Sequence, residues 1–178
     1  MNLINIQYCK TRIGELILGS YAGRLCLMDF RYRKMRPAVD NRIKKGLAAE
    51  FREQNDEIIA EAIRQLEEYL AGHRTAFDIP VLMIGTDFQK DVWRALTEIP
   101  YGKTVTYTEL AKAIKQENAV RAVAGANGAN AIAIIIPCHR VIGSSGELTG
   151  YGGGLSVKKR LLKLERNNSV GQLPKSIF

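Results

Sequence analysis

The chain changes its pattern at Gly85, and this change limits the folds that it can adopt. Before Gly85, short apolar runs between glycine-containing turns are typical of strands, whereas after it the apolar residues recur at helical spacing. With 178 residues, the chain suits one medium domain or two small ones. We expect an α+β domain over residues 1–84 and a mostly helical domain over residues 85–178.

A β-hairpin is the clearest expectation in the first half. Two apolar runs, GELILGS at 14–20 and GRLCLMDF at 23–30, are joined by a short turn, and residues 3–8 alternate loosely like a further strand. Residues 31–46 are basic and irregular and contain Pro37, so we expect a long loop there.

A helix and one more strand complete this half. Asn55 or Asp56 is suited to cap a helix that runs to Ala71 and stops at Gly72. FDIPVLM at 77–83 has the composition of a strand.

The second half predicts helices and one buried strand. The helices are expected from Thr86 to about Glu98, from Thr106 or Thr108 onward, at 118–130 with Asn118 as the cap, and from Leu155 to about Asn167. The second and third of these helices are close together, as in a helix-turn-helix, although any antiparallel helix pair has the same pattern. AIAIIIP at 131–137 is expected to be a buried strand, and the chain from Ser169 to be loosely held.

Charge is unevenly distributed along the chain. The net charge is +8, and residues 86–178 contribute most of it, with 13 basic and 7 acidic side chains against 13 and 11 in residues 1–85. This excess would attract a polyanion such as nucleic acid, and it is also compatible with an ordinary basic surface.

Targeting features and cysteine usage indicate a compartment. The longest apolar run, residues 131–137, is far shorter than the roughly 20 residues of a membrane-spanning helix, and the first residues lack the layout of a secretory signal. Cys9, Cys26 and Cys138 show no close metal-ligand spacing, which fits a reducing environment. We therefore expect a cytoplasmic protein that does not insert into membranes.

Cys138 carries the chemistry that is easiest to interpret. It stands in PCHRV, directly after the apolar run and beside His139. A free thiol has a pKa of about 8.5, so a nucleophilic cysteine needs a base near it. Adjacent side chains on an extended segment point apart, so His139 would act through a water molecule, and Glu147 or Glu165 could orient the imidazole. From these residues alone, a buried and unreactive cysteine is the simpler interpretation.

A set of longer strings resembles one known family. The strings are GTDFQKDVWRAL (85–96), IPYGKTVTYTELA (99–111), VRAVAGANGAN (120–130), IIIPCHRVIGSSGELTGYGGGL (134–155) and KKRLLKLE (158–165). In order and spacing they resemble the C-terminal domain of the O6-alkylguanine-DNA alkyltransferases, also called methylated-DNA–protein-cysteine methyltransferases. The hairpin of the first half resembles the N-terminal domain of that family more loosely. The resemblance implies a ribonuclease H-like first domain and a helix-turn-helix in the second.

The resemblance implies a DNA repair protein that acts once. It would bind double-stranded DNA containing O6-alkylguanine, turn the damaged base out of the duplex and transfer the alkyl group irreversibly to Cys138. Our own hypothesis, based on small residues at positions 131 and 133, adds O4-alkylthymine as a weaker substrate. It implies no cofactor, and a monomer is the default expectation. One alternative is a non-catalytic binder of alkylation damage, but the reactive cysteine is replaced in those relatives. Another, a cysteine hydrolase, has no local signature here.

The resemblance also assigns roles around the thiol. His139 would be the water-mediated base, and Glu165 would orient it. Asn130 would brace the helix pair against the segment that carries Cys138.

Further roles concern the flipped base. Tyr107 would hydrogen-bond the guanine and Arg121 would fill the gap that the base leaves, while Tyr151 would form a wall of the pocket. The carbonyls of Cys138 and Val141 would accept from the exocyclic amine. Backbone N–H groups at Gly152 and Gly153 would be the contacts to O6.

The chain departs from the family pattern at two places. Ala131 and Ala133 stand where relatives often have proline, which predicts a wider pocket that accepts alkyl groups larger than methyl. Cys9, Cys26 and His73 do not match the zinc ligands that some relatives carry, so we expect no bound metal.

Overall fold

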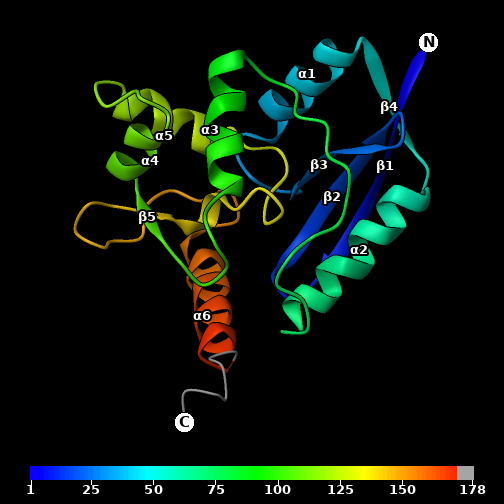
Figure 1. The fold of residues 1–178 in the computed structure, drawn as a ribbon. Helices are drawn as coiled ribbons and strands as arrows, with labels where there is room; N and C mark the ends of the chain where they lie inside the picture. The colour runs from blue at the N-terminus through cyan, green and yellow to red at the C-terminus, as the bar shows by residue number, and fades with distance from the viewer. Residues whose placement is uncertain (172–178) are drawn as a thin grey trace.

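The computed structural model of the protein describes residues 1–171, and Figure 1 shows a β-sheet on one side of the molecule and a group of helices on the other. The sheet side contains β1 (Asn2–Thr11), β2 (Gly14–Tyr21), β3 (Arg24–Phe30), α1 (Arg36–Leu47), β4 (Ala49–Glu53) and α2 (Glu57–Leu70). The helical side contains α3 (Asp87–Thr97), β5 (Val105–Thr106), α4 (Tyr107–Ala113), α5 (Val120–Gly128), the 3-10 turn η1 (Cys138–Arg140), β6 (Val141–Ile142) and α6 (Leu155–Gly171). The expected α+β class is confirmed. Within residues 1–171, no helix is both long and apolar enough to cross a membrane.

The four-stranded sheet has the order β3-β2-β1-β4. β1, β2 and β3 are consecutive antiparallel strands, which confirms the predicted hairpin, and β4 returns parallel to β1 after the α1 crossover. Alternate side chains point to opposite faces, so Leu16 and Leu18 pack in the core that contains α2, whereas Ile17 and Leu27 pack with α1. Because both faces are covered, β2 and β3 are apolar almost throughout.

Residues 31–46 are not a long loop, and this prediction is wrong. α1 begins at Arg36 with Pro37 in its first turn, where the missing N–H of proline leaves no helical hydrogen bond unmade. Val39 and Ile43 are buried four residues apart, while the basic side chains cover the outer face and obscure the apolar stripe in the sequence. β4 was not predicted, because its sequence AEFRE is mostly polar.

The cap of α2 lies where it was expected. The Asp56 carboxylate accepts a hydrogen bond from the Ile59 backbone N–H, and it also accepts from Asn5 on β1 and from Ser20 on β2. This one side chain therefore starts the helix and ties it to two strands.

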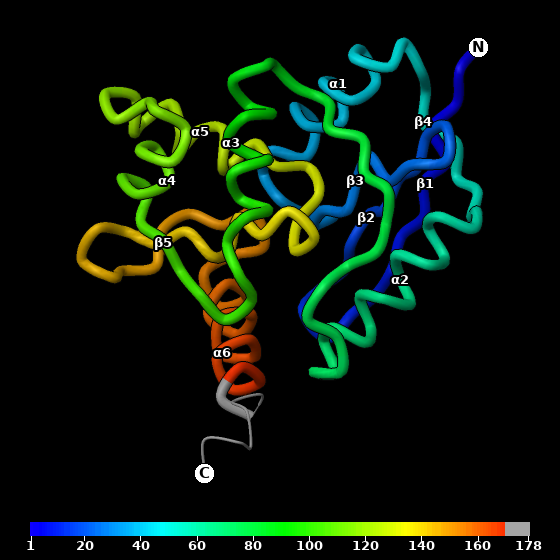
Figure 2. Tube along the Cα trace, in the orientation of Figure 1, coloured from blue at the N-terminus to red at the C-terminus, as the bar shows by residue number. Residues whose placement is uncertain are grey.

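Residues 77–83 and 131–137 are not regular strands, contrary to both predictions. Each forms a single parallel bridge with the outer edge of β3, one between Leu25 and Val81 and the other between Met28 and Ile132. Pro80 has no N–H to continue the first pairing, and Ile134 has a φ of 73°, which turns the chain away in the second. Figure 2 shows this second segment, in yellow, passing between α3 and β3, so the chain that leads to Cys138 is anchored on the sheet.

Three short helices pack together in the second half. Thr86 caps α3 as predicted, and of the two candidates Thr106 and Thr108 it is Thr106 that caps α4, each through a reciprocal capping box. α5 begins after Ala119 without a side-chain cap, so Asn118 does not cap it. The Trp93 indole N–H of α3 donates to the Ala126 carbonyl of α5 over 2.8 Å. α4 and α5 are in contact, and their assignment as a helix-turn-helix remains a prediction.

α6 is longer than expected. It runs to Gly171, so Ser169 lies within the helix and the Ser169 hydroxyl donates to the Glu165 carbonyl over 2.7 Å. The prediction of a loose tail is therefore wrong for residues 169–171, and residues 172–178 lie outside the described part of the chain.

Candidate active site

A cavity of about 1000 Å³ lies between the β3–α1 segment and the second half of the chain. Six of the predicted site residues line it, namely Tyr107, Asn130, Cys138, Tyr151, Gly152 and Gly153. The first half of the chain supplies the opposite wall, chiefly through Phe30, Arg33 and Met35. The cavity therefore joins segments that are more than 100 residues apart in the sequence.

Cys138 begins η1 and is 8% exposed, so its thiol is nearly buried but reaches the cavity. Its backbone N–H donates to the Ile136 carbonyl over 2.8 Å, which fixes the start of the turn. Burial raises the pKa of the Cys138 thiol, and this outweighs the favourable influence of the Arg33 and Lys158 charges. The Cys138 thiol is therefore protonated at neutral pH.

His139 and Glu165 form a fully buried pair behind the thiol. His139 Nε2 lies 2.7 Å from Glu165 Oε1, and both side chains are 0% exposed. Burial lowers the pKa of His139 below its usual value of 6.5, so the imidazole is neutral and donates through Nε2 to the carboxylate. The other ring nitrogen, Nδ1, is buried and has no partner among the described residues, so it is left as an acceptor.

Glu165 is held by several donors. Burial alone would raise its pKa, but the hydrogen bond from His139 and the pairing with Arg140 lower the pKa to about 2. Arg140 Nε and Nη2 each lie 2.9 Å from the carboxylate, and Nη1 donates to the Ile99 carbonyl over 2.6 Å. The Tyr69 hydroxyl of α2 donates to Oε1 over 2.6 Å.

Sequence reasoning missed Arg140 and Tyr69. Arg140 directly follows the Cys-His pair and could have been noticed as a buried cation that needs a carboxylate. Tyr69 lies on the apolar face of α2 beside Leu66 and Leu70, where a hydroxyl group also needs a buried partner.

Asn130 organises the turn that precedes Cys138. Its side-chain oxygen accepts from the Ile132 N–H over 2.9 Å, and its amide donates to the Ile136 carbonyl over 2.8 Å. The side chain thus closes residues 130–136 into a compact loop between the end of α5 and η1. This is the local geometry that the predicted brace requires.

Gly152 and Gly153 pack closely against side chains of the first half of the chain. A Cβ atom on Gly152 would lie 2.9 Å from Arg33 Cζ, and one on Gly153 would lie 2.5 Å from Phe30 Cζ. The Phe30 ring also meets the Tyr151 ring edge-on, with centroids 5.5 Å apart. The missing side chains therefore allow the two halves to close the cavity.

Val141 does not line the cavity and is fully buried. Its carbonyl accepts from the buried ammonium group of Lys158 over 2.6 Å, and the same ammonium donates to the Thr149 carbonyl over 2.7 Å. The Thr149 hydroxyl in turn donates to the Tyr107 hydroxyl over 3.3 Å. Lys158 therefore secures the loop that covers the cavity and links it to Tyr107.

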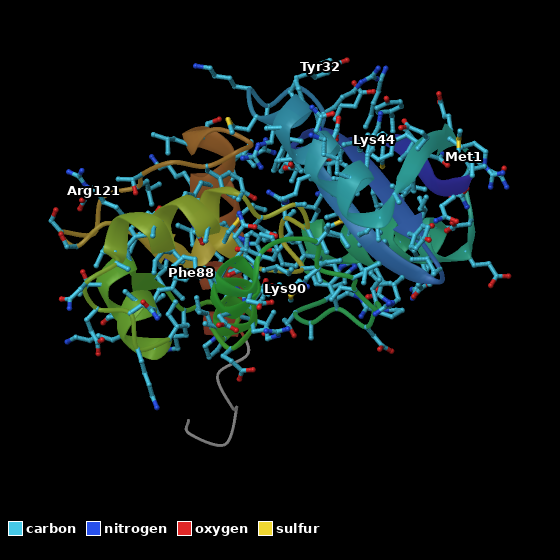
Figure 3. The ribbon with its side chains drawn as sticks, turned by 90° about the horizontal axis from the view of Figure 1, so that it is seen from above. Met1, Tyr32, Lys44, Phe88, Lys90 and Arg121 are labelled. Atoms are coloured by element: carbon cyan, nitrogen blue, oxygen red, sulfur yellow. The ribbon has the colours of Figure 1, made fainter. Side chains whose placement is uncertain are left out.

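Two predicted residues lie elsewhere. Arg121 is exposed on α5 and points away from the sheet, outside the cavity (Figure 3). Ala131 packs in the core around α1, so it cannot widen the pocket, whereas Ala133 does line the cavity.

No cluster of three or more histidine, cysteine or acidic side chains suited to a metal ion occurs within residues 1–171. Cys26 is buried, and its sulfur contacts the Gly19 carbonyl over 3.5 Å. Burial raises the pKa of Cys26 to about 12, so this thiol stays neutral.

Comparison with known proteins covers both halves of the chain. Residues 4–83 match the family model described as the ribonuclease-like domain of 6-O-methylguanine DNA methyltransferase, and residues 87–167 match the model described as its DNA-binding domain. The first of these matches supports the ribonuclease-like fold that the resemblance implied.

Individual relatives are similar over nearly their whole length. The methylated-DNA–protein-cysteine methyltransferase of Methanosarcina barkeri is 58% identical over 89% of this chain and 95% of its own. The protein of the same name from Mycobacterium leprae is 53% identical over 96% of this chain and 98% of its own. A crystal structure of Mycobacterium tuberculosis OGT in complex with DNA has a TM-score of 0.78 and 40% identity, covering 92% of this chain and 94% of that one.

The site geometry, both family models and these relatives agree. The chain belongs to the 6-O-methylguanine DNA methyltransferase family.

Proposed function

We propose that this protein repairs alkylated DNA by moving the alkyl group from O6 of guanine to the sulfur of its own Cys138, once per molecule. The observation that carries this proposal is a nearly buried thiol at the edge of a cavity of about 1000 Å³, backed by the buried His139–Glu165 pair. A non-catalytic lesion binder would have no use for that arrangement.

The transfer is a displacement at the alkyl carbon. The Cys138 thiolate attacks that carbon, an S–C bond forms, and the C–O6 bond breaks. The electron pair of the broken bond stays on the guanine, which takes up the equivalent of the proton that Cys138 gave to His139 and remains in the DNA as an ordinary base. The product is a neutral thioether, whose sulfur is a poor leaving group, so the protein is not regenerated.

His139 serves as the base that ionises Cys138. Its Nε2–H is committed to Glu165, which leaves Nδ1 free to accept the thiol proton through a water molecule. Glu165 keeps this tautomer and stabilises the imidazolium that forms.

The cavity takes the flipped base. Tyr107 and Tyr151 lie on its walls, and a hydroxyl donor beside the purine stabilises the negative charge that develops as the alkyl group leaves. Backbone N–H groups at Gly152 and Gly153 are the donors for O6. The Cys138 carbonyl accepts from the exocyclic amine, whereas the Val141 carbonyl, outside the cavity and bound to Lys158, is not assigned this contact.

Residues 85–178 form the DNA-binding and transfer domain, and residues 1–84 form the supporting domain. α4 and α5 act as a helix-turn-helix whose second helix, with exposed Gly125 and Gly128, approaches the minor groove closely. Arg121 enters the gap that the flipped base leaves. Replacing Arg121 with alanine should slow transfer from duplex DNA more than from free O6-benzylguanine, and equal slowing would reject this role.

The pocket accepts groups larger than methyl, and O4-alkylthymine more weakly. Ala133 lines the cavity, and proline at this position would add bulk there. Ethyl- and benzyl-guanine oligonucleotides should react readily with the protein and more slowly with the Ala133→Val variant, which adds bulk but keeps the Ala133 N–H that donates to the Met28 carbonyl over 2.7 Å. Strict selectivity for methyl in the native protein would contradict this.

Transfer needs only the thiol, the duplex and a reducing environment. We therefore assign no cofactor, a monomeric state and a cytoplasmic location. Free thiols at Cys9, Cys26 and Cys138 support the last of these assignments.

Mass spectrometry tests the proposal directly. After incubation with an oligonucleotide containing O6-methylguanine, the intact protein should gain one methyl group, and peptide analysis should place it on Cys138. Cys138→Ala should gain none and still bind the DNA, whereas Cys9→Ala should react normally. Binding without methyl gain would favour a lesion binder, and repeated turnover would favour a hydrolase.

A further inference from the structure

The carboxylate behind the active-site histidine has a partner from the other half of the chain. Tyr69, on α2 in the first half, donates its hydroxyl to Glu165 Oε1 over 2.6 Å. His139 Nε2 approaches the same oxygen at 2.7 Å, and the Tyr69 oxygen lies 3.5 Å from that nitrogen. Oε1 thus accepts from Tyr69, from His139 and, over 2.9 Å, from Arg140 Nη2.

We propose that Tyr69 is a positioning residue for alkyl transfer: its hydroxyl holds the Glu165 oxygen against His139 and limits how strongly the carboxylate attracts the imidazole proton. This inference rests on the proposed function of Cys138 and adds a residue from residues 1–84 to its relay.

The environment of Tyr69 suits this task. The side chain is 0% exposed, so water does not compete for its hydroxyl. Its ring is fixed between Phe77, with centroids 5.4 Å apart, and Tyr101, with centroids 6.1 Å apart. Burial and the Glu165 carboxylate keep the pKa of Tyr69 well above its usual value, so the hydroxyl remains a donor.

Several charged or titratable groups act on His139 from the elements around it. They are Glu165 and Lys158 on α6, Arg140 on η1, Tyr69 on α2, Tyr151 on the covering loop and Cys138 itself. Arg140 holds both carboxylate oxygens, so the charge of Glu165 stays in place when another donor is removed. Loss of the Tyr69 hydroxyl leaves His139 and Arg140 Nη2 as the donors to Oε1, so the oxygen keeps more negative charge for His139 and stabilises the imidazolium.

The chain contains two histidines, which makes a direct measurement simple. We would titrate the full-length protein with ¹⁵N-labelled histidine by NMR and follow the imidazole nitrogens, with exposed His73 as the internal reference. In Tyr69→Phe, the midpoint of the His139 titration should move to higher pH by about half a unit or more, because one donor to its counter-ion is gone. In a plot of the transfer rate against pH, the part of the curve where the rate rises with pH should also move to higher pH.

Tyr101→Phe is the matched control. Tyr101 packs edge-on against Tyr69, but its hydroxyl accepts from Asn168 over 3.2 Å and has no hydrogen bond to Glu165. This variant should leave the His139 titration where it is in the native protein. An equal shift in both variants would show that packing, and not the shared oxygen, matters.

A second substitution preserves the packing and reverses the sign. 3-Fluorotyrosine at position 69 is a stronger hydrogen-bond donor, so it should move the His139 midpoint to lower pH. No movement with fluorotyrosine, or an unchanged midpoint in a folded Tyr69→Phe protein, would overturn the proposal. Methyl gain on Cys138 is scored separately, so failure of the transfer reaction itself would be recognised.

Discussion

At the scale of single residues, the shape of the cavity depends on two glycines in its wall. Gly152 and Gly153 carry no Cβ atom, and the space is taken by the Arg33 guanidinium and the Phe30 ring. Arg33 also donates to Asp29 over 3.0 Å, so its position is set from its own side of the cavity. The two glycines therefore form the close contact between the two halves of the molecule.

Gly153→Ala should destabilise the protein more than Gly152→Ala. The added methyl at 153 meets a rigid ring at 2.5 Å, whereas at 152 it meets the end of a flexible arginine at 2.9 Å. We expect Gly153→Ala to lower the free energy of unfolding by about 1–3 kcal/mol, measured by urea denaturation. Gly128→Ala, which has open space around the new methyl, is the control and should be neutral or stabilising.

The part of the site that adjacent residues define could be predicted from the sequence. Cys138 and His139 were identified in PCHRV and Glu165 was found because the family motif gives its spacing, whereas Arg140 in the same turn was missed. Tyr69 could not be found in this way, because it reaches Glu165 from 96 residues away in the chain.

At the scale of secondary structure, two arginines from the first half hold the end of α5. Arg33 donates to the Gly128 carbonyl over 2.7 Å, and Arg42 donates to the Ala129 carbonyl over 2.7 Å. Carbonyls at a helix C-terminus lack partners and carry partial negative charge, so two guanidinium groups satisfy and stabilise them. α5, the helix that we propose to bind DNA, is thereby fixed to the sheet side of the molecule.

Arg42→Ala should reduce stability by about 2 kcal/mol, because charged hydrogen bonds to the Ala129 and Ile84 carbonyls are lost. Arg42→Lys should recover part of this, since an ammonium group can replace one of the two contacts. Urea denaturation measures both variants. Arg94→Ala removes only an exposed pair with Asp91 and should change the stability by less than about 0.5 kcal/mol.

Elements with clear end signals were predicted well. α2, α3 and α4 begin after Asp56, Thr86 and Thr106, and each of these side chains makes the expected cap. The apolar segments at 77–83 and 131–137 were wrongly predicted as strands. An apolar composition indicates that a segment is buried, but it does not show whether its backbone pairs with a neighbouring strand. Each segment forms its single bridge with the edge of β3, and which strand lies at the edge of the sheet is decided by the folded structure and not by the local sequence.

At the scale of the whole molecule, the buried Glu165 carboxylate links folding to pH. Its pKa is about 2 in the folded protein against an ordinary 4.5, so its stabilisation is complete above about pH 4.5 and is lost as the pH falls toward 2. The pKa of His139 is lowered by burial, so the unfolded chain binds its proton more readily below about pH 6.5, which acts in the same direction.

We therefore expect the melting temperature to fall steadily as the pH is lowered from 6.5. Glu165 accounts for about 3 kcal/mol of this loss. Glu165→Gln should be less stable at neutral pH, because Arg140 is left without its carboxylate, and should show a flatter profile below pH 4.5. Glu117→Gln removes one exposed charge and should follow the native profile. Parallel profiles for native and Glu165→Gln proteins would contradict this account.

The positive charge of the second half should govern DNA affinity. With +8 on the chain, binding should weaken with salt by about 0.9 log units per log unit of salt for each phosphate neutralised. Fluorescence anisotropy with a labelled duplex measures this slope. Reaction with free O6-benzylguanine should be nearly independent of salt, and salt-independent duplex binding would refute the electrostatic role.

The shared oxygen of Glu165 also has a consequence for how the protein comes into being. A ribosome adds Cys138 roughly 1–5 s before Glu165, because 27 residues separate them and synthesis proceeds at about 5–20 residues per second. During that interval His139 lacks the carboxylate that orients it, and the Tyr69 hydroxyl lacks its acceptor. The arrangement of Cys138, His139 and Glu165 is therefore complete only once α6 has been synthesised and has packed against η1.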